Sequence, residues 1–175
     1  MNFKPVLFLL SAFLLCAFGL PKNIQKKVDK EVKSIFNVET FTLNVVTIPA
    51  EITSTLPSTF TADNFFKIET DSSFLGYAYV AKAASKTDEF DYLVLLDKDL
   101  IVLKAKVLVY REDYGSEIGS KRWLKQFTGK TDQDTLAYSN NIAAISGATI
   151  SAKSMTVAMN NLLQSIKILH SKNMF

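Results

Sequence analysis

The sequence is poor in the side chains that most often bind metals or perform covalent catalysis. Its 175 residues contain one cysteine, Cys16, and one histidine, His170. A single cysteine cannot form a disulfide within the chain, ligate an iron–sulfur cluster alone or attach a c-type haem. A single histidine argues against a His-based metal site and against a Ser-His-Asp triad. We therefore expect no metal site and no catalytic residue, and any redox chemistry would need an organic cofactor.

Signals for nucleic acid and for nucleotide phosphates are also weak. The formal net charge of +3 is too small to indicate a nucleic-acid partner. The run Gly129-Lys130-Thr131 is similar to the end of a P-loop, but Leu124 stands where the motif needs its first glycine. We expect neither nucleic-acid binding nor P-loop chemistry.

Residues 1–20 predict a targeting segment. After a short basic start, residues 6–20 form an uncharged apolar run that is shorter than the roughly 20 residues of a membrane span. Ala17 and Gly19 supply the small residues of a cleavage site. We predict a signal peptide, with an uncleaved membrane anchor or lipidation at Cys16 as alternatives. The expected location is the periplasmic side of the bacterial inner membrane.

The rest of the chain divides into a lead-in segment, residues 21–62, and one domain, residues 63–175. Within the lead-in, Ile24, Val28 and Val32 recur at helical spacing and predict an amphipathic helix over residues 21–36. Four later segments are dense in β-branched and aromatic residues and are separated by polar breaks. These predicted strands are residues 65–69, 74–81, 90–96 and 101–110. The pattern predicts an α+β fold, a twisted and mainly antiparallel sheet flanked by helices.

The run from Ile145 to Ser151 leads into the best-patterned helix of the sequence. Apolar residues then recur at the spacing of one helical face: Met155, Ala158, Met159, Leu162, Leu163, Ile166 and Leu169. Thr149 or Ser151 is expected at the N-cap. Because a helix N-terminus presents unpaired N–H groups, this stretch could hold a phosphate, with Gly147 permitting close backbone approach.

The motif Ser146-Gly147-Ala148-Thr149, followed by Ser151, resembles the flavinylation motif of FMN-binding domains. Examples are the C subunit of the sodium-translocating NADH:quinone reductase and the G subunit of the Rnf complex. The resemblance implies that a flavin transferase joins FMN, through its phosphate, to the hydroxyl of Thr149. Ser146, Gly147, Ala148 and Ser151 would surround that phosphate.

A second segment, from Tyr114 to Trp123, resembles the glycine-bearing loop and short helix of the same family. The resemblance implies that Glu117, Ile118 and Gly119 contact the flavin, whereas Trp123 is expected in the core. Family motifs usually carry an acidic residue three places before the serine. In this sequence that position is Ala143, which departs from the family pattern.

The function predicted from the sequence is that of an exported electron-transfer flavoprotein with covalent FMN. Its expected partners are the flavin transferase and membrane redox proteins that donate or accept electrons, and association with the membrane itself is also expected. Two alternatives remain. One is an extracytoplasmic flavin-dependent reductase of a small acceptor. The other is a non-redox binding module, in which the motif is only a helix cap.

Overall fold

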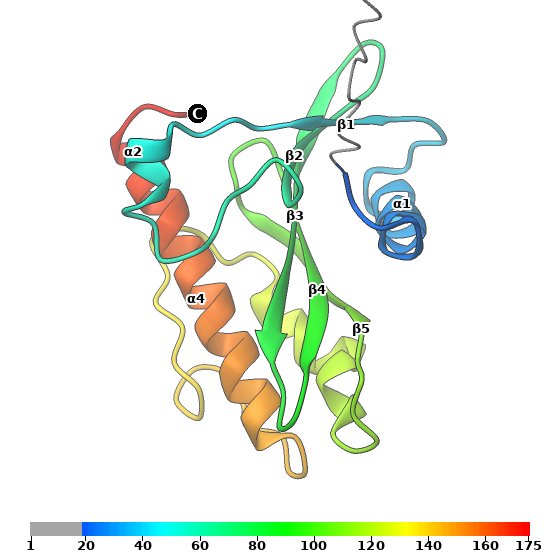
Figure 1. The fold of residues 1–175 in the computed structure, drawn as a ribbon, viewed down its shortest axis with the longest axis vertical. Coiled ribbons are helices and arrows are strands. Elements are labelled where there is room, and N and C mark those ends of the chain that lie inside the picture. Colours follow the sequence, from blue (N-terminus) through cyan, green and yellow to red (C-terminus); the bar gives the residue numbers. More distant parts are fainter. Residues whose placement is uncertain (1–18) are drawn as a thin grey trace, which may run out of the picture.

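The structure, a computed structural model, describes residues 19–175, so most of the predicted targeting segment, including Cys16, lies outside the described residues. A five-stranded antiparallel sheet with its strands in chain order forms the centre of the fold (Figure 1). The strands are β1 (Thr42–Val45), β2 (Phe65–Glu69), β3 (Phe74–Ala84), β4 (Glu89–Leu96) and β5 (Val102–Val109). The predicted α+β class is confirmed, and the four predicted strands are β2 to β5.

Tight polar turns join β2 to β3, β3 to β4 and β4 to β5, at the polar breaks of the sequence. The turn between β4 and β5 is organised by Asp97, whose carboxylate accepts hydrogen bonds from the amides of Asp99 at 2.9 Å and Ile101 at 2.8 Å. Leu100 completes this turn with a φ of 61°. In β4 every residue after Glu89 is buried, as expected for an inner strand that is covered on both faces.

Helix α4 (Thr149–Ser171) covers one face of the sheet (Figure 1). Its apolar residues form one core with the aromatic side chains of β2, β3 and β4. The buried members of this helix that the sequence pattern predicts are Met155, Met159, Leu162, Leu163, Ile166 and Leu169. Full burial of one such side chain contributes roughly 1.5–3 kcal/mol, so this face holds α4 in place on the sheet.

Helix α1 (Lys22–Phe36) covers the opposite face, next to β5 (Figure 1). Ile24, Val28 and Val32 are buried against Leu93 and other residues of the sheet, so the predicted amphipathic helix is confirmed. The helix ends at Asn37, which adopts a left-handed conformation with a φ of 54°. The sheet is therefore the middle layer of three.

Four short helical segments complete the fold. They are α2 (Ala50–Thr53) in the lead-in, and η1 (Ser116–Gly119), α3 (Lys121–Leu124) and η2 (Lys125–Phe127) after β5. The last three pack on β5 and bring the glycine-bearing segment beside the start of α4. Within residues 19–175, no helix combines the length and the apolar character that crossing a membrane requires.

Candidate functional site

An open hollow of about 550 Å³ lies at the end of the sheet where α4 begins. Three parts of the chain form it: the turn between β3 and β4, the segment after β5, and the motif at the start of α4. In Figure 1 this is the lower end of the molecule, beside the orange start of α4. The lining residues are Lys86, Thr87, Tyr110, Glu112, Asp113, Tyr114, Gly147, Ala148, Thr149, Ile150 and Ser151.

The first turn of α4 differs from the predicted cap. Ala148 occupies the N-cap position and its side chain makes no capping hydrogen bond, so the prediction of Thr149 or Ser151 at this position is wrong. Thr149 is the first helical residue, and Ser151 is the third. The amides of Thr149, Ile150 and Ser151 precede the first intrahelical bond, from Ala152 N to Ala148 O at 2.9 Å. Within residues 19–175 these three amides have no acceptor, so they are free to bind an anion.

Tyr110 is the hydrogen-bond partner of the Ser151 hydroxyl. Its hydroxyl lies 3.0 Å from the Ser151 hydroxyl and donates to the carbonyl of Tyr114 at 3.1 Å. Because the Tyr110 proton is directed at Tyr114, the Ser151 hydroxyl donates to Tyr110. In the sequence, Tyr110 is predicted only as the end of a strand. The position of its hydroxyl depends on two loops meeting in space, and no local pattern predicts that.

Gly115 brings the glycine-bearing segment close to the motif. Its φ of 84° lies in the left-handed region, and a Cβ at this position would stand 2.8 Å from the Tyr110 hydroxyl and 3.3 Å from the Cβ of Ala148. The neighbouring Tyr114 side chain is 86% exposed at the rim of the hollow. A residue without a side chain is therefore required here by both conformation and space.

Three residues predicted to contact the flavin lie farther along the same segment. Glu117, Ile118 and Gly119 form η1 and do not line the hollow. Glu117 is exposed, whereas Ile118 is fully buried in the core. Contact between these residues and a flavin stays a prediction, and at Ile118 such a contact would have to use the backbone.

The two sequence segments that resemble the family hold each other directly. Trp123 donates from its indole nitrogen to the carbonyl of Ala143 at 2.7 Å, and the amide of Ala143 donates to the Gln126 side chain at 2.8 Å. Trp123 is 94% buried (6% exposed) and packs edge-on against Phe127, which confirms its predicted place in the core. The chain just before Ser146 is thus fixed by the helical segment that follows β5.

Ser146 and Gly147 are both exposed, and Gly147 adopts a φ of 82°. Of these two, only Gly147 lines the hollow. Gly147 turns the chain into α4 and leaves the side chain of Thr149 exposed to solvent. The motif thus presents an exposed threonine at a helix end whose first three amides are free.

Charged groups at the hollow are organised by Glu112. Its carboxylate accepts hydrogen bonds from the amides of Thr87 at 2.6 Å and Asp88 at 3.2 Å. The bond from Thr87 is the main reason that the pKa of Glu112 falls from its ordinary value of 4.5 to about 2. Glu112 therefore stays ionised and fixes the turn between β3 and β4 against the segment after β5. Lys86 is the cation among the lining residues.

His170 lies at the opposite end of α4 from the hollow. Its Nδ1 atom is 2.8 Å from the Asp132 carboxylate. Burial raises the pKa of Asp132, but the hydrogen bond from His170 and nearby positive charges outweigh it, so the net shift is downward. This contact ties the loop before the motif to the last turn of α4. Within residues 19–175, no cluster of His, Cys, Asp and Glu suits a metal ion.

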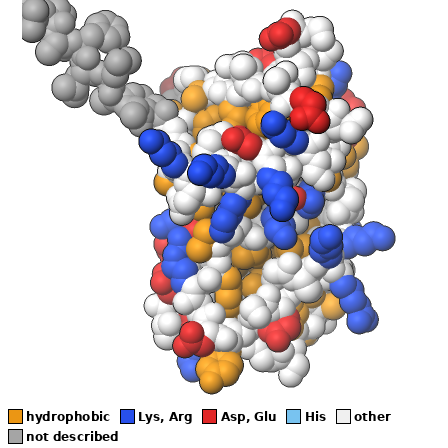
Figure 2. Space-filling view, turned by 90° about the vertical axis from the view of Figure 1, so that its right-hand side faces the viewer, with side chains coloured by type: hydrophobic (Ala, Val, Ile, Leu, Met, Phe, Trp, Pro, Cys, Tyr) orange, Lys and Arg blue, Asp and Glu red, His pale blue; other side chains and the backbone are white. Residues whose placement is uncertain are grey.

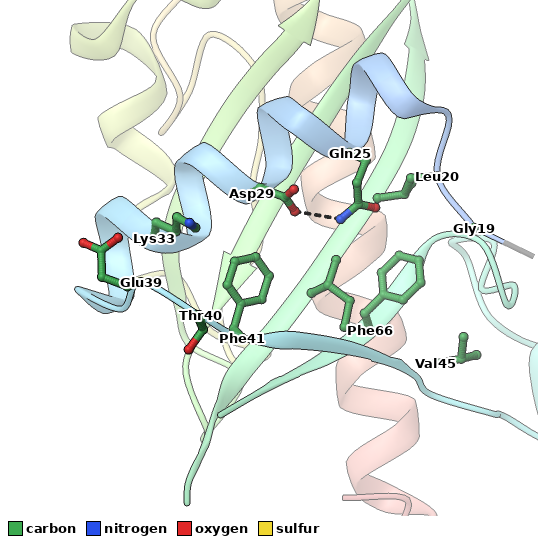
Figure 3. A pocket seen from close by; sticks show the side chains of 11 residues that line it. Gly19, Leu20, Gln25, Asp29, Lys33, Glu39, Thr40, Phe41, Val45 and Phe66 are labelled. Atoms are coloured by element: carbon green, nitrogen blue, oxygen red, sulfur yellow. Dashed lines mark hydrogen bonds between the residues drawn. The ribbon is translucent and has the colours of Figure 1, made fainter. Parts of the chain in front are cut away.

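A second hollow lies on the other side of the sheet, between α1 and β1 (Figure 3). Phe41, Val45 and Phe66 supply apolar walls, and Gln25 donates to Asp29 at 2.7 Å along its rim. No residue of either motif lines it. The residues that carry the resemblance therefore lie away from this second hollow.

Comparison with known families supports the same region. Residues 86–164 match the family model described as the FMN-binding domain. The match begins in the turn between β3 and β4, ends within α4, and includes every residue predicted to contact the flavin. A search of curated proteins finds no match to this chain.

Proposed function

We propose, on the premise that residues 86–164 match the family model of the FMN-binding domain, that FMN is esterified to Thr149 in an exported electron carrier. The protein is a flavin-binding protein whose cofactor is FMN. The covalent link, the electron-transfer role and the location outside the cytoplasmic membrane are the proposal. The observation that carries it is the exposed hydroxyl of Thr149 at the start of a 23-residue helix, beside an open hollow.

The residues at the hollow fit a phosphate ester. The helix dipole favours a negative group at this end by about 0.3–1 kcal/mol, and three amides have no other acceptor within the described residues. A volume of about 550 Å³ lies in the range of roughly 300–1,000 Å³ that small-molecule sites occupy. The hollow is open, so part of the cofactor would remain accessible to redox partners.

The side chains around Thr149 have distinct parts in this proposal. Ser151 is buried and its hydroxyl is bonded to Tyr110, so it fixes the helix start. Ser146 is exposed and is the hydroxyl available to bind the phosphate. Lys86, across the hollow, supplies the positive charge. When bound, FMN supplies the redox chemistry, and the protein supplies attachment, orientation and electrostatics.

The proposed partners follow from the chemistry of attachment and from the N-terminal segment. A threonine hydroxyl is a poor nucleophile unless it is activated. Within residues 19–175 the Thr149 hydroxyl makes no hydrogen bond to another side chain, so a flavin transferase would perform the attachment. The apolar run of residues 6–20 supports export. Membrane redox proteins would then donate and accept the electrons.

Intact mass spectrometry tests the covalent link. The full chain is co-expressed with a flavin transferase in a host that exports it, beside Thr149→Ala and Thr47→Ala. Thr47 is exposed and lies away from the hollow, so it controls for the loss of a surface threonine. We expect a gain equal to FMN minus water in the wild type and in Thr47→Ala, and none in Thr149→Ala. An unmodified wild type, or a modified Thr149→Ala, would refute attachment at this residue.

A further inference from the structure

A groove of about 480 Å³ with several lysines at its rim lies between α1, β5 and α3. We call it the lysine groove. It lies on the face of the molecule that carries α1, where Figure 2 shows Lys and Arg side chains gathered across the middle. The lining residues are Lys30, Glu31, Ser34, Ile35, Leu103, Lys104, Ala105, Lys106, Gly119, Lys121, Leu124, Lys125 and Thr128.

The charge of the lysine groove is strongly positive and largely uncompensated. Of its lining residues Glu31 alone is acidic, and its carboxylate is paired with Lys104 at 2.5 Å. Within residues 19–175, no carboxylate lies within 4.0 Å of the amino groups of the other four lysines. These are Lys30, Lys106, Lys121 and Lys125. Four like charges around one groove repel each other, so an anionic partner would be bound favourably.

The floor of the lysine groove is apolar. Leu103, Ile35 and Leu124 line it with apolar side chains; the first two are half-buried and Leu124 is buried. A concave surface with an apolar floor and a cationic rim suits a protruding protein segment that carries both acidic and apolar side chains. A flat lipid surface matches the rim charges but cannot fill the floor.

The lysine groove is also close to the hollow at Thr149. A Cβ on Gly115 would stand 3.3 Å from both the Ala148 Cβ and the Gly147 carbonyl oxygen at that hollow, so Gly115 lies beside it. Four residues later Gly119 lines the lysine groove. The single short helix η1 joins the two places. A partner that sits in the groove would therefore lie beside a flavin attached to Thr149.

We propose that the lysine groove is the docking site for an acidic segment of a partner protein. The docking itself does not depend on the proposed function. The further statement that this partner exchanges electrons with the flavin rests on it. Positive charge at the rim would raise the rate of encounter with the acidic segment. The apolar floor would then slow its release.

The test uses the full chain and a short fluorescent peptide of alternating glutamate and leucine, with binding followed by anisotropy. A peptide of alternating glutamate and serine isolates the contribution of the apolar floor. We compare Lys121→Glu/Lys125→Glu with Lys98→Glu/Lys172→Glu, which changes the net charge equally at exposed positions outside the groove. Thermal unfolding of each variant verifies that the fold is retained.

We expect the groove variant to bind the glutamate–leucine peptide about tenfold more weakly than the control variant, and the serine peptide to bind more weakly than the leucine peptide. Binding should weaken as salt rises from about 0.05 M to about 0.5 M, because screening shortens the reach of the lysines. Equal affinities of the two variants would overturn the proposal. So would a groove variant that loses binding only to vesicles of phosphatidylcholine with about one third phosphatidylglycerol, which would identify a membrane surface instead.

The same peptide measurements on Thr149→Ala separate the two proposals. If Thr149→Ala still binds the glutamate–leucine peptide, docking depends on the groove alone. This holds whether or not the wild type carries FMN. A wild type that carries FMN but gives no selective peptide binding would leave the proposed function intact and refute the docking site.

Discussion

The hydroxyl groups of Tyr110 and Ser151 lie 3.0 Å apart and join the end of β5 to the first turn of α4. Through its second bond, to the carbonyl of Tyr114, Tyr110 also holds the glycine-bearing segment. One side chain thus connects both segments that resemble the FMN-binding family. Its removal should affect the site more than the rest of the fold.

Tyr110→Phe removes this hydroxyl and keeps the ring. We expect the free energy of unfolding to fall by about 1–2 kcal/mol, because one partly buried and one exposed hydrogen bond are lost at roughly 0.5–1.5 kcal/mol each. Denaturant unfolding measures the change, and Tyr138→Phe is the control, since the Tyr138 hydroxyl makes no hydrogen bond within the described residues. Equal losses in the two variants would show that the Tyr110 contacts are energetically unimportant.

Gly115→Ala should lower the free energy of unfolding by more than Gly129→Ala, its control. Gly115 and Gly129 both have positive φ, 84° and 78°, but an added Cβ meets the Tyr110 hydroxyl at 2.8 Å in the first case and nothing within 4 Å in the second. Backbone strain alone costs about 1–2 kcal/mol, and the clash in Gly115→Ala should add about 1–3 kcal/mol. Melting curves of the two variants give the difference. Indistinguishable melting temperatures would refute the close approach of Gly115 to Tyr110.

Glu112 should make the turn between β3 and β4 sensitive to acid. Its pKa is lowered in the folded protein, from 4.5 to about 2, so the ionised form stabilises the fold. That contribution is fully present above pH 4.5 and is lost as the pH falls towards about 2. The amide resonance of Thr87, which donates to Glu112, should titrate near the lower value. A midpoint near 4.5, or an unchanged titration in Glu112→Gln, would contradict this contact.

Ala143→Asp should raise the fraction of protein that carries FMN when the flavin transferase is limiting. The substitution restores the acidic residue that family motifs usually have three places before the serine. Ala143 is exposed, and its backbone bonds to Trp123 and Gln126 do not involve its side chain. The change should therefore alter stability by no more than about 0.5 kcal/mol.

Ala144→Asp is the matched control, because the neighbouring residue is also exposed and receives the same charge. Intact mass measures the modified fraction in both variants. A rise of equal size in the two would indicate a general effect of charge rather than a requirement at residue 143.

Local patterns predicted most of the regular structure. Strands β2 to β5 and both long helices follow from local pattern, because the spacing of apolar residues is a property of contiguous sequence. Strand β1 is not among the predicted strands. The helix predicted over residues 21–36 is α1, which begins one residue later. The ends of the strands follow less closely from local pattern. Strand β3 continues to Ala84, three residues beyond its predicted end.

The cap of α4 shows the limit of such patterns. Ser151 has the residue type of an N-cap, but its hydroxyl bonds to Tyr110, a residue 41 positions away. The tertiary structure decides which partner the Ser151 hydroxyl bonds, because the position of Tyr110 depends on where β5 ends. The lysine groove is similar, since its lysines come from α1, β5 and the segment after β5.

The sequence by itself determined the layers of the fold, the motif at Thr149 and its resemblance to FMN-binding domains, because each depends on residues close together in the chain. Only the tertiary structure decided that Tyr110, Tyr114 and Thr149 share one hollow, and that Glu117 and Ile118 do not line it. It also decided that a cationic groove lies beside this hollow. These relationships arise when distant segments pack on one sheet, where steric fit and hydrogen bonding select neighbours that no spacing in the sequence encodes.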